Sequence, residues 1–155
     1  MSRSRMRILA NLAFFMMTVT GTSLAGVRYD VVLNGPNAGT ASAATGTAVL
    51  ILNDAQDELT YEITHTGLEG KENAAHFHYG PPGAVAPILL TLPLGSPKTG
   101  VWSLSPEDLG FLLAGEVFIL VHSDVYMAGE IRGNVTQGQV ATEKGTWGSV
   151  KGLFR

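Results

Sequence analysis

The stretch LTYEITHT, residues 59–66, places apolar and polar side chains at alternate positions. Leu59, Tyr61 and Ile63 share one side with His65, and the other side carries three threonines and a glutamate. Successive side chains of a strand point to opposite faces, so this pattern predicts a strand with one face on a core and the other in water. Such one-sided strands are typical of antiparallel sheets.

Further segments of similar length are rich in β-branched and apolar residues and are separated by turn-forming residues. They are Val27–Leu33, Thr47–Leu52, Ala74–Tyr79, Ile88–Leu92, Gly100–Leu104, Glu116–His122 and Ile131–Val135. We expect Thr47–Leu52 to be buried throughout and Glu116–His122, apolar on both faces, to be central. With 19 glycines and 7 prolines in the chain, these segments predict an all-β sandwich or partly closed barrel.

One short helix interrupts the strands. Ser105 is a typical N-cap, Pro106 suits the first helical position, and Glu107 and Asp108 are acidic residues of a first turn. Gly115 is the expected end. The two acids are therefore interpreted as helix-start residues and not as a catalytic carboxylate pair.

The first 25 residues have the pattern of a secretory signal peptide. Arg3, Arg5 and Arg7 precede an apolar stretch over residues 8–20, and a small-residue cleavage site ends at Ala25. We therefore expect a periplasmic or secreted protein without a membrane anchor after cleavage. The chain has no cysteine, but the remaining length is sufficient to bury a core without disulfides.

The charge of the remaining chain limits its partners. The first 25 residues hold three of the ten basic residues and none of the 13 acidic ones, so the rest of the chain is clearly acidic. Nucleic acid and anionic membrane surfaces are poor partners for such a protein. We divide it into a folded domain over residues 26–136 and a flexible linker with a C-terminal tail over residues 137–155.

Three of the four histidines form a candidate metal site. His76 and His78 flank Phe77, and an H-x-H pair in a strand places both imidazoles on one face. His122, at the end of another apolar strand, could supply a third ligand if it comes within about 7 Å of the pair. Three imidazoles without a thiolate suit copper, with zinc as the alternative. The competing interpretation is structural, with the imidazoles bonded to loop backbone next to the Pro-Pro-Gly turn.

Other residues near these motifs have structural interpretations. His65 shares the core-facing side of its strand, so it is the weakest of the candidate ligands. Glu130 and Arg132 alternate onto one face, which favours an ion pair or a backbone anchor. Met127, like Tyr79 and Tyr126, could flank a metal site, but packing is the default.

Several motifs together resemble a known family. They are GTAVLIL, LTYEITHTGL, AAHFHYGPPG, GVWSLSPEDLGFLLAG, VHS and AGEIRG, spread over residues 27–135. This set is similar to the CHRD domain, named for chordin and widespread in exported bacterial proteins. The resemblance implies a fold similar to copper–zinc superoxide dismutase, which is an immunoglobulin-like Greek-key β-barrel.

The resemblance to the dismutase is partial. His76 and His78 resemble two of its copper ligands, and His122 resembles a later one. The zinc-binding histidines and aspartate, the disulfide cysteines and the long zinc and electrostatic loops have no counterpart here. The resemblance is therefore compatible with a single remaining metal site and does not carry dismutase activity over to this chain.

Two functions follow from these observations. The first is an exported protein that binds one transition metal, copper favoured, through His76, His78 and His122. The second is a non-enzymatic interaction module that presents the loop Gly80–Pro87 or the C-terminal tail to a protein partner. No nucleophile-elbow, phosphate-binding or dinucleotide-binding motif is present. We assign no catalytic residue and expect binding, not catalysis.

Overall fold

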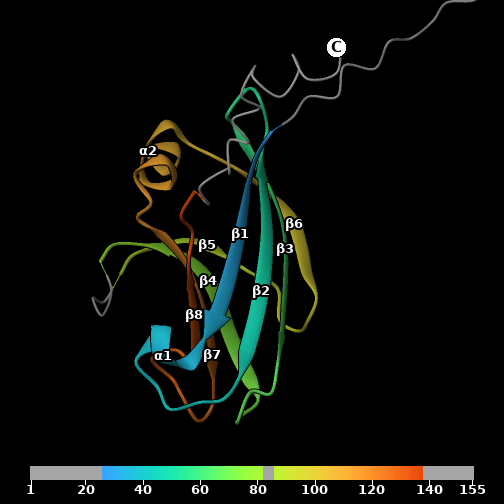
Figure 1. Ribbon diagram of the computed structural model, residues 1–155, viewed down its shortest axis with the longest axis vertical. Helices are drawn as coiled ribbons and strands as arrows, with labels where there is room; N and C mark the ends of the chain where they lie inside the picture. The colour runs from blue at the N-terminus through green and yellow to red at the C-terminus, as the bar shows by residue number, and fades with distance from the viewer. Residues whose placement is uncertain (1–25, 82–85, 138–155) are drawn as a thin grey trace, which may run out of the picture.

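The computed structural model describes residues 26–81 and 86–137, and there the chain forms an eight-stranded antiparallel sheet that curls into a nearly closed barrel (Figure 1). The strands are β1 (Val27–Asn34), β2 (Thr45–Leu52), β3 (Glu58–Thr66), β4 (Glu72–Tyr79), β5 (Ile88–Thr91), β6 (Lys98–Ser103), β7 (Val117–Ser123) and β8 (Ile131–Asn134). The helices are α2 (Pro106–Ala114) and the single turn α1 (Gly35–Ala38). The predicted all-β class is confirmed.

The strand order is β5-β4-β7-β8-β1-β2-β3-β6. Strands β1, β2 and β3 form a simple meander, whereas β4 pairs with β7 and β3 pairs with β6. These pairings between strands that are not consecutive in the chain are of the Greek-key type. Strands β5 and β6 are the two edges, and the barrel is open between them.

The core lies inside the barrel and follows the alternation of the strands. In β3, Leu59 and Ile63 are completely buried and Tyr61 is nearly so, as the sequence predicts. The expectation of a fully buried Thr47–Leu52 segment is wrong, because Ile51 is 42% exposed while Leu50 and Leu52 are buried. In an antiparallel sheet whose outer face is in contact with water, buried and exposed side chains alternate even where the outward residues are apolar.

Strand β4 is fixed by the side chain between its two histidines. Phe77 is fully buried, makes an edge-to-face contact with Tyr61 (ring centroids 5.7 Å apart) and stacks on Trp102 at 5.1 Å. Because Phe77 points inward, His76 and His78 must point outward. The hydrophobic core thus determines which face of the sheet carries the imidazoles.

Helix α2 packs beside the end of β4 and has the predicted caps. The Ser105 side chain accepts from the backbone N–H of Asp108 (3.1 Å), and Gly115 ends the helix in a left-handed conformation. Phe111 stacks on Tyr79, with ring centroids 3.8 Å apart. Neither helix of the described chain has the length and hydrophobicity needed to cross a bilayer. The predicted signal peptide and most of the predicted tail lie outside the described residues.

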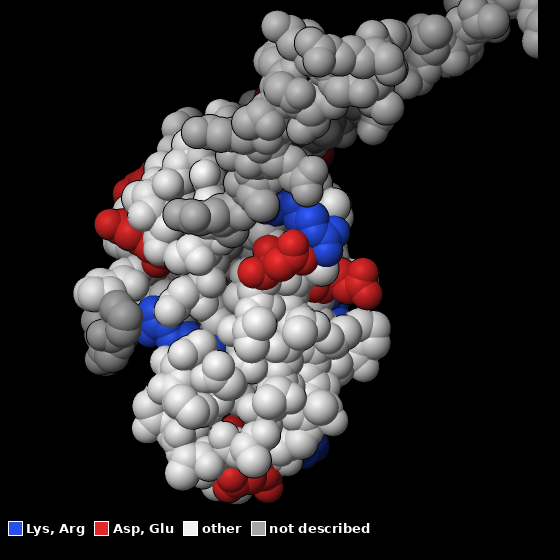
Figure 2. Space-filling view, viewed as in Figure 1, with Lys and Arg blue, Asp and Glu red and all other residues white. Residues whose placement is uncertain are grey.

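Charged side chains are intermingled on the face of the molecule seen in Figure 2. Basic and acidic groups adjoin one another there, and much of this face carries neither. One exposed pair joins Arg28 to Asp30, with 2.7 Å between nitrogen and oxygen. The described residues on this face thus form no continuous basic patch.

Candidate metal centre

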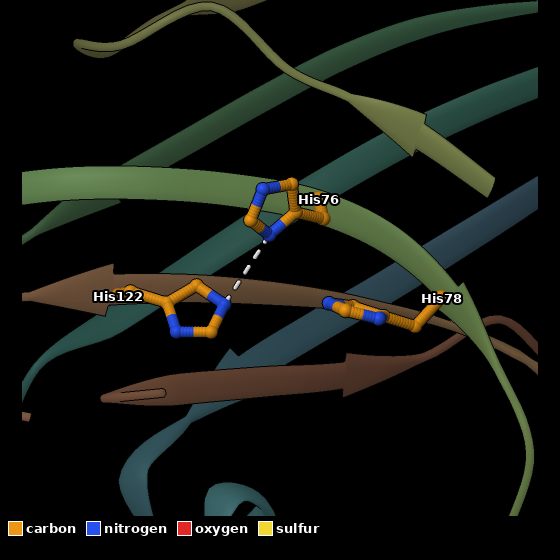
Figure 3. A group of neighbouring side chains, drawn as sticks. All are labelled: His76, His78 and His122. Carbon is orange, nitrogen blue, oxygen red and sulfur yellow. Dashed lines mark hydrogen bonds between the residues drawn. The ribbon is translucent and has the colours of Figure 1, made fainter. Parts of the chain in front are cut away.

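The three histidines at residues 76, 78 and 122 converge on the outer face of the barrel (Figure 3). Strands β4 and β7 pair antiparallel, with Ala74 opposite His122 and His76 opposite Leu120. His122 is therefore a diagonal neighbour of His76. One ring nitrogen of each histidine lies within 4.8 Å of the others. Metal–imidazole bonds are about 2.0–2.1 Å long, so small ring rotations would let the three share one ion.

Backbone carbonyl groups orient two of the rings. The Nδ1–H of His78 donates to Ala86 O (2.9 Å) and lies 3.2 Å from Pro87 O, and that of His122 donates to Met127 O (3.0 Å). In a neutral imidazole with Nδ1 protonated, Nε2 carries the free lone pair. Backbone contacts of this kind fix the tautomer and orientation of metal-binding histidines.

The remaining ring nitrogens of the cluster face one another. Nε2 of His78 is buried and has no hydrogen-bond partner among the described residues. Nδ1 of His76 lies 3.4 Å from Nε2 of His122. A buried nitrogen without a partner is costly in a folded protein. The donor set of three imidazole nitrogens, one of them unsatisfied, fits a transition-metal ion that prefers nitrogen ligands.

The surroundings favour the neutral, metal-binding form of the His76 and His78 rings. Burial, followed by the proximity of His122 and of His78, lowers the pKa of His76. Burial also lowers the pKa of His78, the carbonyls of Ala86 and Pro87 partly oppose this, and His122 and Arg132 add to the lowering. Because only the neutral imidazole can bind a metal, these shifts leave the lone pairs available at neutral pH.

An aromatic ring and a guanidinium border the cluster. Phe118 of β7 stacks on His78, with ring centroids 5.2 Å apart, and the Arg132 guanidinium carbon lies 3.4 Å from the Phe118 centroid. Arg132 is buried, and its Nε donates to Asn134 Oδ1 (2.9 Å). The expected ion pair with Glu130 does not form between these described residues. The guanidinium thus contributes a positive charge near His78.

Glu130 takes the other role expected of it, that of a backbone anchor. Its Oε1 accepts from the Ser42 hydroxyl and from the Glu69 N–H, both at 2.7 Å. Its carbonyl accepts from the Thr40 hydroxyl (2.9 Å), and its own N–H donates to Val121 O (2.7 Å). Glu130 therefore joins two loops to the strand that carries His122.

His65 lies apart from the cluster. Its Nε2 is 3.2 Å from Glu72 Oε2, and the other oxygen of Glu72 pairs with the buried Lys98. The Lys98 ammonium also donates to Pro93 O (2.9 Å) and Gly95 O (2.5 Å). Sequence reasoning missed this Glu72–Lys98 pair. Lys98 precedes the predicted strand Gly100–Leu104 and lies in the turn-like stretch GSPKTG, so no signal in the sequence indicated that this lysine is buried.

The comparisons with known proteins agree with this fold. Among protein families, the CHRD domain matches residues 29–135, which covers every strand after the first two residues of β1 and all three clustered histidines. Comparison with curated proteins and with solved structures found no match. The chain belongs to the CHRD family.

Proposed function

We propose that this protein is an exported CHRD-domain protein that binds one transition-metal ion, with copper preferred, through His76, His78 and His122. The observation that carries the proposal is the convergence of three ring nitrogens within 4.8 Å, one of which is buried without a partner. Export rests on the leader pattern of residues 1–25 and on the family resemblance.

Copper is preferred for a chemical reason. A site of nitrogen donors binds divalent copper more tightly than zinc or the other divalent first-row ions. A bound ion would supply a positive centre with an exchangeable position, whereas the residues of this chain supply only orientation and neutral donors. We propose binding of the metal and assign no turnover to the site.

Metal titration of the full chain tests the proposal. Calorimetry with Cu(II) and with Zn(II) should show one ion per chain, and Cu(II) should displace Zn(II). His76→Ala is the sharpest variant, because among the described residues the only hydrogen bond of the His76 ring is to His122. Its loss should weaken binding by about 100-fold or more while the fold is kept.

His65→Gln is the matched control, since it removes the one histidine outside the cluster. This variant should bind metal as the parent does. A folded parent that binds neither ion would refute the proposal. That result would favour the interaction module, in which His78 and His122 serve only to hold the backbone of residues 86, 87 and 127.

A further inference from the structure

The sulfur content of the chain points to one residue beside the cluster. The sequence has no cysteine and five methionines, four of which lie within the first 17 residues. The fifth is Met127, in the loop between β7 and β8. If the leader is removed, Met127 carries the only sulfur atom of the protein.

Met127 is hydrogen-bonded to a candidate ligand, His122. Its backbone carbonyl accepts the hydrogen bond that orients His122 (3.0 Å). Its Sδ lies 3.1 Å from Nδ2 of Asn73, which directly precedes Ala74, the residue paired with His122. The carbonyl contact places the Met127 backbone beside His122, and the Asn73 contact places the thioether at the end of β4 that pairs with His122.

The side chain of Met127 is not used for packing. It is 70% exposed, the highest value among the exposed large hydrophobic residues of the described chain. Thioether sulfur is a weak hydrogen-bond acceptor, so the contact with Asn73 is easily exchanged for a stronger one. Three rotatable bonds let the sulfur move without any change in the backbone.

We infer that the Met127 thioether is a ligand of the same site when it holds monovalent copper. Soft thioether sulfur selects Cu(I), whereas imidazole suits the divalent ions Cu(II) and Zn(II). Three imidazoles with one thioether would therefore let the site keep copper in both oxidation states. This inference rests on the proposed function, because it requires the histidine cluster to bind metal.

The test uses Met127→Leu, which keeps the volume of the side chain and removes the sulfur. The full chain is expressed in an exporting host, and the N-terminus of the recovered protein is checked by mass. Anaerobic competition with a coloured Cu(I) chelator should show that the Cu(I) affinity of the variant is about tenfold or more below that of the parent. Cu(II) and Zn(II) affinities should stay within about threefold of the parent values, since the three imidazoles are intact.

Val125→Leu is the matched control, because Val125 is an exposed apolar residue of the same loop and has no sulfur. It should leave Cu(I) affinity unchanged. X-ray absorption at the copper edge gives a second readout: the Cu(I) parent should show one sulfur neighbour that Met127→Leu lacks.

Two results separate this inference from the proposed function. Equal Cu(I) affinity in the parent and in Met127→Leu, with no sulfur neighbour in the parent, overturns the role of Met127 and leaves the histidine site intact. A parent that binds neither Cu(II) nor Zn(II) overturns the proposed function, and the role of Met127 with it.

Discussion

The four histidines of this chain divide into two environments that differ in what the ring nitrogens meet. His65 faces a carboxylate, since its Nε2 lies 3.2 Å from Glu72, which in turn pairs with the buried Lys98. The rings of residues 76, 78 and 122 face one another, and their group includes no carboxylate from the described part of the chain. In the first environment the His65 Nε2 has a charged partner, whereas in the second the buried Nε2 of His78 has no hydrogen-bond partner among the described residues.

This difference distinguishes a structural histidine from the candidate ligands. A nitrogen that already has a charged partner gains little from a metal ion, whereas a buried nitrogen without a partner gains a bond that the fold does not supply. We therefore expect the Glu72–Lys98 network to govern stability and the cluster to govern metal binding. Four predictions examine that separation, from the largest expected effect to the smallest.

The largest effect on stability should come from Lys98→Met. This change leaves the Glu72 carboxylate partly uncompensated in a buried position, and removal of one partner of a buried pair costs about 3–5 kcal/mol. Denaturant unfolding should show this loss of stability. Without denaturant, the folded variant should bind Cu(II) with the same affinity as the parent. Exposed Lys71→Met serves as the control. If Lys98→Met binds metal more weakly than the parent and Lys71→Met does not, the Glu72–Lys98 network and the histidine cluster are coupled.

The second prediction concerns stabilisation by the metal. With free Cu(II) at 100 times its dissociation constant, the free energy of unfolding should rise by about 2.7 kcal/mol. The rise should be absent in His76→Ala, which loses one ligand, and present in His65→Gln. Thermal unfolding with and without metal measures it. An equal rise in both variants would show that Cu(II) binds outside the cluster.

The third prediction is a dependence of stability on acid pH. Burial raises the pKa of Glu130, but the neighbouring donor groups of Ser123, Glu69, Ser42 and Gly70 leave that pKa below its ordinary value of 4.5. Its contribution to stability is therefore fully present above pH 4.5 and is lost as the pH falls through the lowered value.

Glu130→Gln should remove this contribution. At neutral pH the variant should be less stable by about 1.5 kcal/mol, since bonds to a charged acceptor are lost. Its stability should also fall less steeply in acid than that of the parent. Exposed Glu62→Gln is the control. Identical acid profiles for the parent and Glu130→Gln would remove Glu130 from the account of acid sensitivity.

The smallest effect is expected for His65→Gln. Glutamine can still donate to Glu72, so the free energy of unfolding should fall by about 1 kcal/mol or less. Calorimetric titration should give the parent's Cu(II) affinity. A loss of affinity as large as that of His76→Ala would abolish the distinction between the two groups of histidines.

The strands could be predicted from the sequence because their pattern is local. Period-2 alternation predicted a strand at LTYEITHT, and Ser105 with Pro106 predicted the start of α2. Both predictions lie within two residues of the observed bounds of β3 and α2. The same alternation placed His76 and His78 on the outer face. It failed for β2, where the apolar outward residue Ile51 was expected inside, because hydrophobicity alone does not say whether a second layer covers a face.

The rest of the site could not be predicted, because it depends on contacts between distant segments. His76 and His122 are 46 residues apart, and only the pairing of β4 with β7 brings them together. The carbonyls that orient His78 and His122, and the network around Glu72 and Lys98, arise from loops whose course has no periodic signal. The sequence did single out Met127 as a residue that could flank a metal site, but it favoured packing for this side chain, which is 70% exposed in the structure.

The pairing of β4 with β7 also decides when the site comes into existence. In an unfolded chain, the two histidines of the H-x-H pair are close together in the sequence. His122 is 46 residues from His76, so bringing it to the pair closes a long loop, and only folding offsets that entropic cost. A polypeptide passing through a membrane unfolded would therefore travel with at most a weak two-ligand site. The third histidine joins the site only when the barrel has folded. The protein would therefore acquire the metal that is available where folding is completed, and not the metal available where it is synthesised.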